Sequence, residues 1–352
     1  MRVQHVAGGV ALVLASALVL SASAVSDRTV SFPDPALRSA VTHALGTAGV
    51  VKESALSELT ALEAVGAGIR DLGGLEHATG LQSLDLSNNQ IGDISPLGSL
   101  NNLRWVNLQG NQIRDAGALG HLTALIGLDV ADNLISELGF LRSLVNLREL
   151  RIVRLPIQDI NALEPLENLR VLWCGGNHLK DISVLEHLQQ LELAYLWGND
   201  IRDLLPLTVL PRLEYLNLCS NNLSDISELA KLTRLRVLEL DGNNLQDLAP
   251  LSGLEQLGRL TLEGNQVRDL TALPALRTWD STPDTRGFFD YSCENPGLDL
   301  RDNRISDLSV LAEKLPRGQW VALSGNPIDF SPASAALQVV ETLRADGVDV
   351  CY

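Results

Sequence analysis

The sequence predicts an α/β solenoid, a stack of short similar units that each contribute one strand and one short helical turn. Two observations support this fold class. A 22-residue motif, Leu-x-x-Leu-x-Leu-x-x-Asn-x-Ile-x-Asp-Ile-x-x-Leu-x-x-Leu, recurs from about Leu59 almost to the C-terminus. A fixed period of this length is typical of a solenoid. The first leucine of the motif returns in ten units without a change of register, at Leu59, Leu81, Leu103, Leu125, Leu147, Leu169, Leu191, Leu213, Leu235 and Leu257.

The unit that spans residues 81–102 indicates what each position of the motif does. Its first three leucines alternate with polar residues, which is the pattern of a half-buried strand. Asn89 then leaves the strand, and its side-chain amide can satisfy backbone groups at the bend. The apolar residues between 91 and 100 return to the interior at roughly helical spacing. Each unit therefore buries one wedge of leucines, and only the stacking of units closes the core.

Two polar residues recur beside the leucines. Asparagine returns at positions 89, 111, 133, 177, 199, 221, 243, 265, 303 and 326, and Ala67 and Leu155 interrupt this series. An acidic residue returns at Asp71, Asp93, Asp115, Glu137, Asp159, Asp181, Asp203, Asp225, Asp247, Asp269 and Asp307. The acids can be read as a ladder of metal ligands or as residues that cap one short turn per unit. A calcium loop needs several oxygens within one loop, which favours capping, and we predict neither a metal nor another cofactor.

The formal net charge of −16 comes largely from these repeated acids. The acidity is therefore mostly a consequence of the repeat and says little about a partner. It does argue against nucleic acid as a ligand, because nucleic-acid binding requires a basic surface.

Both ends of a solenoid expose an apolar layer that needs a cap. At the front, residues 25–58 are expected to form a helical cap whose helix starts at Asp34-Pro35 and stops at Gly46. The repeats are expected over residues 59–330. At the back, residues 331–352 are expected to form a second cap, with a helix that starts at Ser331-Pro332. Its inward residues would be Leu337, Val340 and Leu343, followed by a short strand at Val348 and Val350.

Residues 1–24 have the pattern of a secretory signal peptide. Arg2 precedes an apolar run, and Ala22-Ser23-Ala24 offers a small-residue cleavage site. The run is short for a membrane span, although an uncleaved anchor is the alternative. We expect an exported protein, secreted or periplasmic, that is monomeric and has no membrane span in its mature chain. Export permits a disulfide, and Cys293 and Cys351 are the candidate pair.

The repeat pattern, down to NNQIGDISPLGSL at residues 88–100, resembles the leucine-rich repeats of bacterial internalin-like proteins over roughly residues 30–350. The resemblance implies a curved horseshoe with a parallel sheet on the concave face and short 3-10 turns on the convex face. It also implies a helical cap at the front and a concave surface that binds a protein or a glycan. It brings no catalytic residue.

The register fails after Leu276, where an insertion of about sixteen residues spans 279–294. Three interpretations remain open for it: a loop packed on the flank of the solenoid, a contact loop beside the concave face, or a degenerate repeat. The insertion is rich in aromatic residues for a chain with 4% aromatics, and they are Trp279, Phe288, Phe289 and Tyr291.

Residues between the strand leucines are expected to face outward on the concave sheet. In repeats five to eight they form a candidate ligand-binding patch, with Trp105 standing apart three repeats earlier. Trp, Tyr and Arg are the residues in which binding energy concentrates. The alternative is that arginine stacks on tryptophan within the sheet and nothing else binds. The other residues of the patch are Arg148, Arg151, Arg154, Trp173, Tyr195, Trp197 and Tyr215.

Three classes of function are considered for this chain: protein binding, glycan binding and catalysis. We expect a protein ligand on the patch, with a glycan as the alternative because rings can stack on sugar faces. Coplanar rings along a groove would favour sugar, whereas rings that converge on a pocket would favour a side-chain anchor. An enzyme is not expected, since no metalloprotease, nucleophile-elbow or phosphate-loop motif occurs. Glu239 and Asp299 share the face but lie about 14 Å apart, too far for a glycosidase pair.

Overall fold

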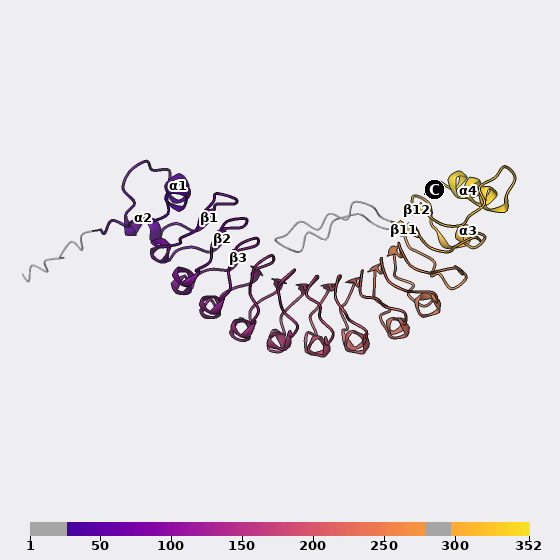
Figure 1. Cartoon of the computed structure of the whole chain (residues 1–352), viewed down its shortest axis with the longest axis horizontal. Helices are drawn as coiled ribbons and strands as arrows, with labels where there is room; N and C mark the ends of the chain where they lie inside the picture. Colours follow the sequence, from indigo (N-terminus) through magenta and orange to yellow (C-terminus); the bar gives the residue numbers. More distant parts are fainter. Residues whose placement is uncertain (1–26, 279–296) are drawn as a thin grey trace, which may run out of the picture.

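The computed structural model describes residues 27–278 and 297–352, which form a curved solenoid (Figure 1). The described residues build a single parallel sheet of thirteen strands, whose order in the sheet is their order in the chain. The sheet lies on the inner side of the arc. The strands are β1 (Ala61–Glu63), β2 (Ser83–Asp85), β3 (Trp105–Asn107), β4 (Gly127–Asp129), β5 (Glu149–Arg151), β6 (Val171–Trp173), β7 (Leu193–Tyr195), β8 (Tyr215–Asn217), β9 (Val237–Glu239), β10 (Arg259–Thr261), β11 (Gly297–Asp299), β12 (Trp320–Ala322) and β13 (Asp349–Cys351).

The strands pair without any slip of register. Glu63 pairs with Asp85, Asp85 with Asn107, and the same column continues from strand to strand to Ala322. Each strand leucine points into the solenoid, and the residues on either side of it face the concave surface. The predicted solenoid fold, and the prediction that the residues between the strand leucines face the concave side, are therefore confirmed.

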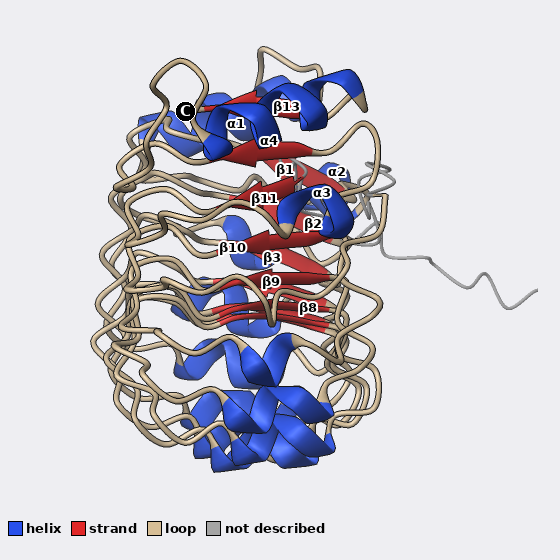
Figure 2. Cartoon of the chain, turned by 90° about the vertical axis from the view of Figure 1, so that its right-hand side faces the viewer, coloured by secondary structure: helices blue, strands red, loops and turns tan. Residues whose placement is uncertain are grey.

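Short 3-10 helices form the convex side, opposite the sheet (Figure 2). The aspartate before each turn accepts the backbone N–H two residues later, as Asp93 does from Ser95 at 2.8 Å. Ten of the eleven repeated acids make this bond, which confirms the capping interpretation; Glu137 is the exception. Among the described residues the turns are η1 (Leu75–His77), η2 (Ser95–Ser99), η3 (Gly117–His121), η4 (Gly139–Ser143), η5 (Asn161–Leu163), η6 (Ser183–His187), η7 (Leu205–Val209), η8 (Ser227–Lys231) and η9 (Ala249–Leu251).

The asparagines form a hydrogen-bonded ladder along one side of the solenoid. The Asn89 Oδ1 accepts the Ile69 N–H of the preceding unit, and its Nδ2 donates to the Ala64 and Leu86 carbonyls. At the interruption, Leu155 is buried in place of an asparagine, and its N–H donates to Asn177 Oδ1. The ladder therefore continues past this unit through the asparagine of the next one.

The N-terminal cap has the predicted helix, α1 (Pro35–Ala44), followed by α2 (Glu53–Ser57). Asp34 caps α1 by accepting the N–H groups of Ala36 and Leu37 with one oxygen. Its second oxygen accepts the N–H groups of Arg70 and Asp71 in the first repeat. These four bonds lower the pKa of Asp34 against the opposing effect of burial. One carboxylate thus joins the cap to the repeats.

The predicted start of the C-terminal helix was wrong by about three residues. After the short α3 (Leu311–Lys314), helix α4 runs from Ala335 to Ala345, with Ser334 rather than Ser331 as its N-cap. Ala333 has a φ of +70°, so the chain turns there and cannot be helical. Val340 and Leu343 face the core as predicted, but Leu337 is only half-buried.

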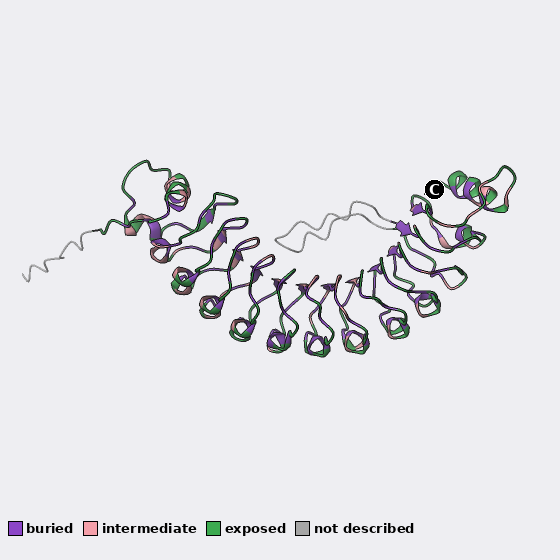
Figure 3. Cartoon of the chain, viewed as in Figure 1, coloured by how far each residue is buried: buried purple, intermediate pink, exposed green. Residues whose placement is uncertain are grey.

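The core is a continuous leucine layer between the sheet and the convex turns (Figure 3). Cys174 occupies a leucine position within it, and burial raises the pKa of its thiol to about 12. Within the described part of the chain, no helix has both the length and the apolar character that a membrane crossing requires.

Candidate functional site

A second apolar cluster lies on the concave face, outside the main core. We call it the concave cluster, and it consists of Val171, Trp173, Leu193, Tyr195, Trp197, Tyr215 and Val237. Strands β6 to β9 supply these residues, except that Trp197 follows β7. The first and third residues of each strand face outward, so neighbouring strands bring them together. Apolar groups thus gather on a face that other repeats fill with polar residues.

Three rings of the cluster stack on one another across three strands. The Trp173 and Tyr195 ring centroids are 4.0 Å apart, with planes inclined by 26°. The Tyr195 and Tyr215 centroids are 4.4 Å apart, inclined by 34°. The guanidinium carbon of Arg151 lies 3.8 Å from the Trp173 centroid, so it covers the other face of the indole. The arginine-on-tryptophan contact named in the alternative interpretation therefore occurs.

The expectation that the aromatic side chains are exposed was wrong for the two tyrosines. Tyr195 is 7% exposed and Tyr215 is 8% exposed. They are buried because each ring packs against its neighbours in the stack and against the aliphatic residues beside it. Trp173 and Trp197 are half-buried.

Charged groups close both ends of the stack. At one end Arg151 reaches Asp129, with 3.7 Å between the guanidinium nitrogen and the carboxylate oxygen. At the other end the Tyr215 hydroxyl donates to Glu239 at 2.8 Å, and Glu239 also pairs with Arg259 at 3.2 Å. These contacts link seven neighbouring strands, β4 to β10, into one line of interacting side chains. The apolar centre is therefore bordered by ion pairs.

The three arginines of repeat five do not form one group. Arg151 joins the stack, whereas Arg154 pairs with Asp132 through two hydrogen bonds of 2.6 and 2.8 Å. That pairing raises the pKa of Arg154. Arg148 is exposed and lies before the start of β5. Arg148 precedes β5 and Arg154 lies in the turn that follows it, so the two lie at opposite ends of the strand.

Two tryptophan side chains fill the space beside glycines of a neighbouring repeat. A Cβ atom at Gly175 would overlap the Trp197 indole, and one at Gly127 would overlap the Trp105 indole. Neither glycine has a positive φ, so the backbone conformation does not require glycine at these positions. The missing side chains instead make room for the two rings. Trp105 is four strands away from Trp197 and does not join the concave cluster.

The sequence interpretation missed Val171, Leu193 and Val237. They occupy the first position of their strands, where other repeats carry residues such as Ser83 or Glu149. The uninterrupted run of large apolar or aromatic residues at this position in four consecutive repeats, Val171, Leu193, Tyr215 and Val237, was a signal in the sequence. The central column of the sheet contains only two of the cluster's rings, Trp173 and Tyr195.

The burial of acidic side chains on this face predicts an unusual pH dependence of the free energy of unfolding. Asp129 is 1% exposed, and burial raises its pKa to about 6 in spite of Arg151 and a backbone N–H donor. Such a group stabilises the fold below its unfolded pKa of about 3.9 and loses that contribution as the pH rises through about 6. The capping aspartates act in the opposite sense, because backbone hydrogen bonds lower the pKa of Asp93 and Asp181. Their contribution is lost as the pH falls below about 4.

We therefore expect the free energy of unfolding to be greatest near pH 4 and to decline by about 3 kcal/mol toward pH 7. Urea denaturation between pH 3 and pH 8 measures this profile. Asp129→Asn keeps the acceptor for the Ala131 N–H but cannot ionise, so this variant should lose most of the decline. A wild-type profile that is flat from pH 4 to pH 7 would contradict the prediction.

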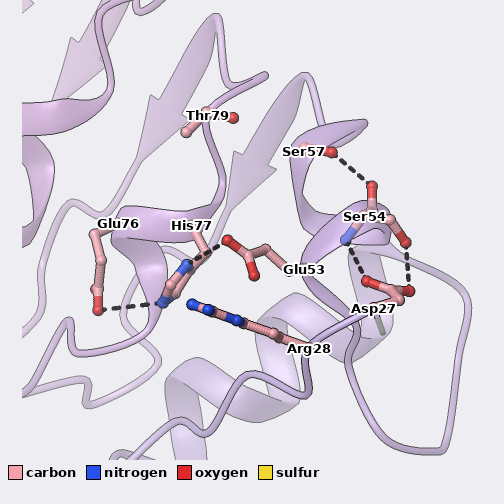
Figure 4. Close-up of a pocket in the computed structure, with 8 residues that line it drawn as sticks. All are labelled: Asp27, Arg28, Glu53, Ser54, Ser57, Glu76, His77 and Thr79. Atoms are coloured by element: carbon pink, nitrogen blue, oxygen red, sulfur yellow. Dashed lines mark hydrogen bonds and ion pairs between the residues drawn. The ribbon is translucent and has the colours of Figure 1, made fainter. Parts of the chain in front are cut away.

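A separate hollow of about 730 Å³ lies between the N-terminal cap and the first repeat (Figure 4). Its lining is polar and includes Arg28, Glu53 of α2, and Glu76 and His77 of η1. The His77 ring lies between the two carboxylates, 3.2 Å from the Glu53 oxygen and 3.7 Å from the Glu76 oxygen. His77 and its two carboxylates are only partly buried, so the hollow lacks the dry character of a ligand pocket.

Other predicted features fall outside residues 27–278 and 297–352. These are the signal peptide at residues 1–24, the insertion with Trp279, Phe288, Phe289 and Tyr291, and one half of the candidate disulfide, Cys293. Within those two ranges, no group of three or more His, Cys, Asp and Glu side chains could hold a metal ion.

The in-register parallel sheet, the asparagine ladder and the 3-10 turns define a leucine-rich-repeat protein. Family models agree: residues 79–121 match the model "Leucine Rich repeats (2 copies)" and residues 211–267 match the model "Leucine rich repeat". A search of curated proteins finds no match.

The chain is structurally similar to Listeria internalins over most of its length. An internalin (InlF) from Listeria monocytogenes is 28% identical, with a TM-score of 0.74 over 91% of each chain. The functional domain of InlJ from the same species, which includes a cysteine ladder, is 22% identical, with a TM-score of 0.63 over 88% of this chain and 74% of that one. A leucine-rich-repeat protein of Leptospira interrogans is 21% identical, with a TM-score of 0.61 over 78% of this chain and 74% of that one.

Proposed function

We propose that this protein is an exported binding protein that engages a protein ligand through the concave cluster. The observation that carries the proposal is the apolar cluster at the middle of the concave sheet, bordered by the ion pairs of Arg151 and Glu239. Protein interfaces concentrate their binding energy in such apolar centres with charged borders. Stacked rings on a rigid sheet also lose little conformational freedom on binding. The pattern of residues 1–24 supports export.

The stacking favours a protein over a glycan as the ligand. A sugar ring binds by lying on an open aromatic face, but the Trp173 and Tyr195 rings cover each other and Arg151 covers the remaining face of Trp173. The stack can therefore offer mainly ring edges to a ligand. Ring edges suit contacts with protein side chains.

One observation favours the glycan alternative. Trp197 lies beside Gly175 and does not appear in the ring stack. An indole outside the stack can offer a ring face, which sugar stacking needs. We therefore retain glycan binding at Trp197 as the second candidate function.

The test is capture of extracellular ligands by the mature protein beside the double variant Trp173→Ala, Trp197→Ala. Loss of two hot-spot residues should weaken capture by about 30-fold or more. The matched control is Leu205→Ala, Val209→Ala, because both residues are exposed and lie on the convex turn η7. Equal capture by all three proteins would reject the concave cluster as the binding site.

A glycan array with the wild type and Gly175→Ala separates the two candidates. The added methyl group would displace Trp197 from its position beside Gly175. Glycan signals that the wild type shows and Gly175→Ala lacks would favour the second candidate. Gly253→Ala is the control, because nothing lies within 4 Å of a Cβ built at Gly253.

A further inference from the structure

A row of arginines lies on the rim of the concave face, just before the strands start. Arg104, Arg148 and Arg170 occupy equivalent positions of repeats three, five and six. Backbone bonds connect the row: Ile126 N–H donates to the Arg104 carbonyl, Arg148 N–H to the Ile126 carbonyl, and Arg170 N–H to the Arg148 carbonyl, each at 2.8 Å. We call these three residues the arginine row. The solenoid therefore aligns them along its axis on one rim.

The three arginines of the arginine row form fewer ion pairs than the other arginines of the sheet. All three side chains are exposed. Within residues 27–278 and 297–352, neither Arg104 nor Arg148 forms an ion pair, and Arg170 has only a 3.9 Å contact with Glu192. At that distance, with the Arg170 side chain half exposed, the ion pair contributes little. Four arginines on or beside the concave face are instead paired with acids: Arg151, Arg154, Arg259 and Arg301.

The row is thus a cationic strip on a protein with a formal charge of −16. Such a local excess of positive charge attracts an anionic group and orients it before contact. The planar guanidinium groups can each bind a carboxylate through two parallel hydrogen bonds.

We propose that the arginine row binds a short acidic segment of the protein ligand, in extended conformation, with carboxylates at alternate positions. Three strand spacings separate Arg104 from Arg170, about 14 Å. Residues i, i+2 and i+4 of an extended peptide point to one side and span about 13 Å. Three alternate carboxylates therefore match the two ends of the row, and the middle carboxylate lies about 3 Å from the level of Arg148, which the long arginine side chain can span. This inference rests on the proposed function, because the row borders the concave cluster.

The surroundings of the row favour a short acidic segment over a long polyanion. The next two residues of the same column are Glu192 and Glu214, joined by the same backbone bonds. A sulfated or uronate-containing glycan that followed the rim past Arg170 would meet Glu192 and Glu214 before the next arginine of the column, Arg236, which contacts Glu214 at 3.9 Å. On the other side the column continues with the uncharged Gln82 and Thr60. A segment with about three charges is accommodated, and a longer one is opposed.

The test uses the mature protein and the peptide acetyl-Glu-Ser-Glu-Ser-Glu-amide, with the corresponding glutamine peptide as the uncharged probe. Binding is measured by calorimetric titration at low and high salt. The variant Arg104→Gln, Arg148→Gln, Arg170→Gln should bind the acidic peptide at least about tenfold more weakly at low salt. It should also lose most of the salt dependence. Its far-ultraviolet spectrum and urea midpoint establish that it folds.

The matched control removes the same charge elsewhere. Arg114, Arg202 and Arg268 are exposed and lie beside the repeated aspartates, away from the rim. Replacing these three with glutamine should leave peptide binding within about twofold of the wild type. Equal weakening by both triple variants would mean that only net charge matters and would overturn the proposal.

Two further outcomes are informative. The first tests the chemical class of the ligand, and the second tests whether the arginine row takes part in capture of the protein ligand. Heparin that binds the row more tightly than the peptide and displaces it would overturn the acidic segment in favour of a sulfated glycan. If the row variant captures the protein ligand like the wild type while Trp173→Ala, Trp197→Ala does not, the proposed function stands and this inference fails. If neither variant loses capture, both fail.

Discussion

Replacing Asn221 with alanine is expected to lower the free energy of unfolding by about 4 kcal/mol, because several buried backbone groups would lose their partners. Asn221 is completely buried. Its Oδ1 accepts the Ile201 N–H at 3.2 Å, and its Nδ2 donates to the Leu196 and Leu218 carbonyls at 3.0 Å each. An unsatisfied buried group costs about 1–3 kcal/mol, and water cannot reach these three. Urea denaturation followed by circular dichroism gives the value.

Asn146→Ala is the matched control for Asn221→Ala. Asn146 also donates its Nδ2 to a carbonyl of the preceding unit, that of Thr123 at 2.9 Å, but it is exposed. Water replaces the lost bond there, so the expected loss is below about 1 kcal/mol. Similar losses for the two variants would show that the buried ladder contributes no more than a surface bond.

The second large effect is expected from Tyr195→Ala, which should cost about 3 kcal/mol by removing the middle ring of the concave stack. The ring lies between Trp173 and Tyr215, so its loss ends two stacking contacts and leaves a gap in the cluster. We also expect a loss of near-ultraviolet circular dichroism, since coupled rings give much of that signal. Thermal and urea unfolding measure the stability.

Tyr195→Phe separates stacking from other consequences of the substitution. Phenylalanine keeps a ring of the same size between the two neighbours and lacks only the hydroxyl. This variant should retain most of the stability and of the near-ultraviolet signal. If Tyr195→Phe loses as much as Tyr195→Ala, the stack does not account for the effect.

Much of the fold followed from the sequence because each unit meets only its neighbours. The period identified which residues are buried, which form the asparagine ladder, and which column faces the concave surface from Glu63 to Ala322. The start of the C-terminal helix was harder to predict from the sequence, because Ser331-Pro332 and Ser334 are both acceptable helix starts. The left-handed backbone at Ala333 decided between them.

The candidate site depended on contacts between units, which the period does not specify. The sequence placed three arginines in repeat five but could not tell that Arg154 would pair with Asp132 and that Arg148 would join a rim. It also gave no reason to expect Trp197 to lie beside Gly175. By itself, then, the sequence determined the position of every residue within its repeat and whether that position is buried, because the backbone repeats and burial follows the period. Only the tertiary structure decided which side chains meet, because a long side chain can reach across a strand spacing of about 4.8 Å to any of several neighbours.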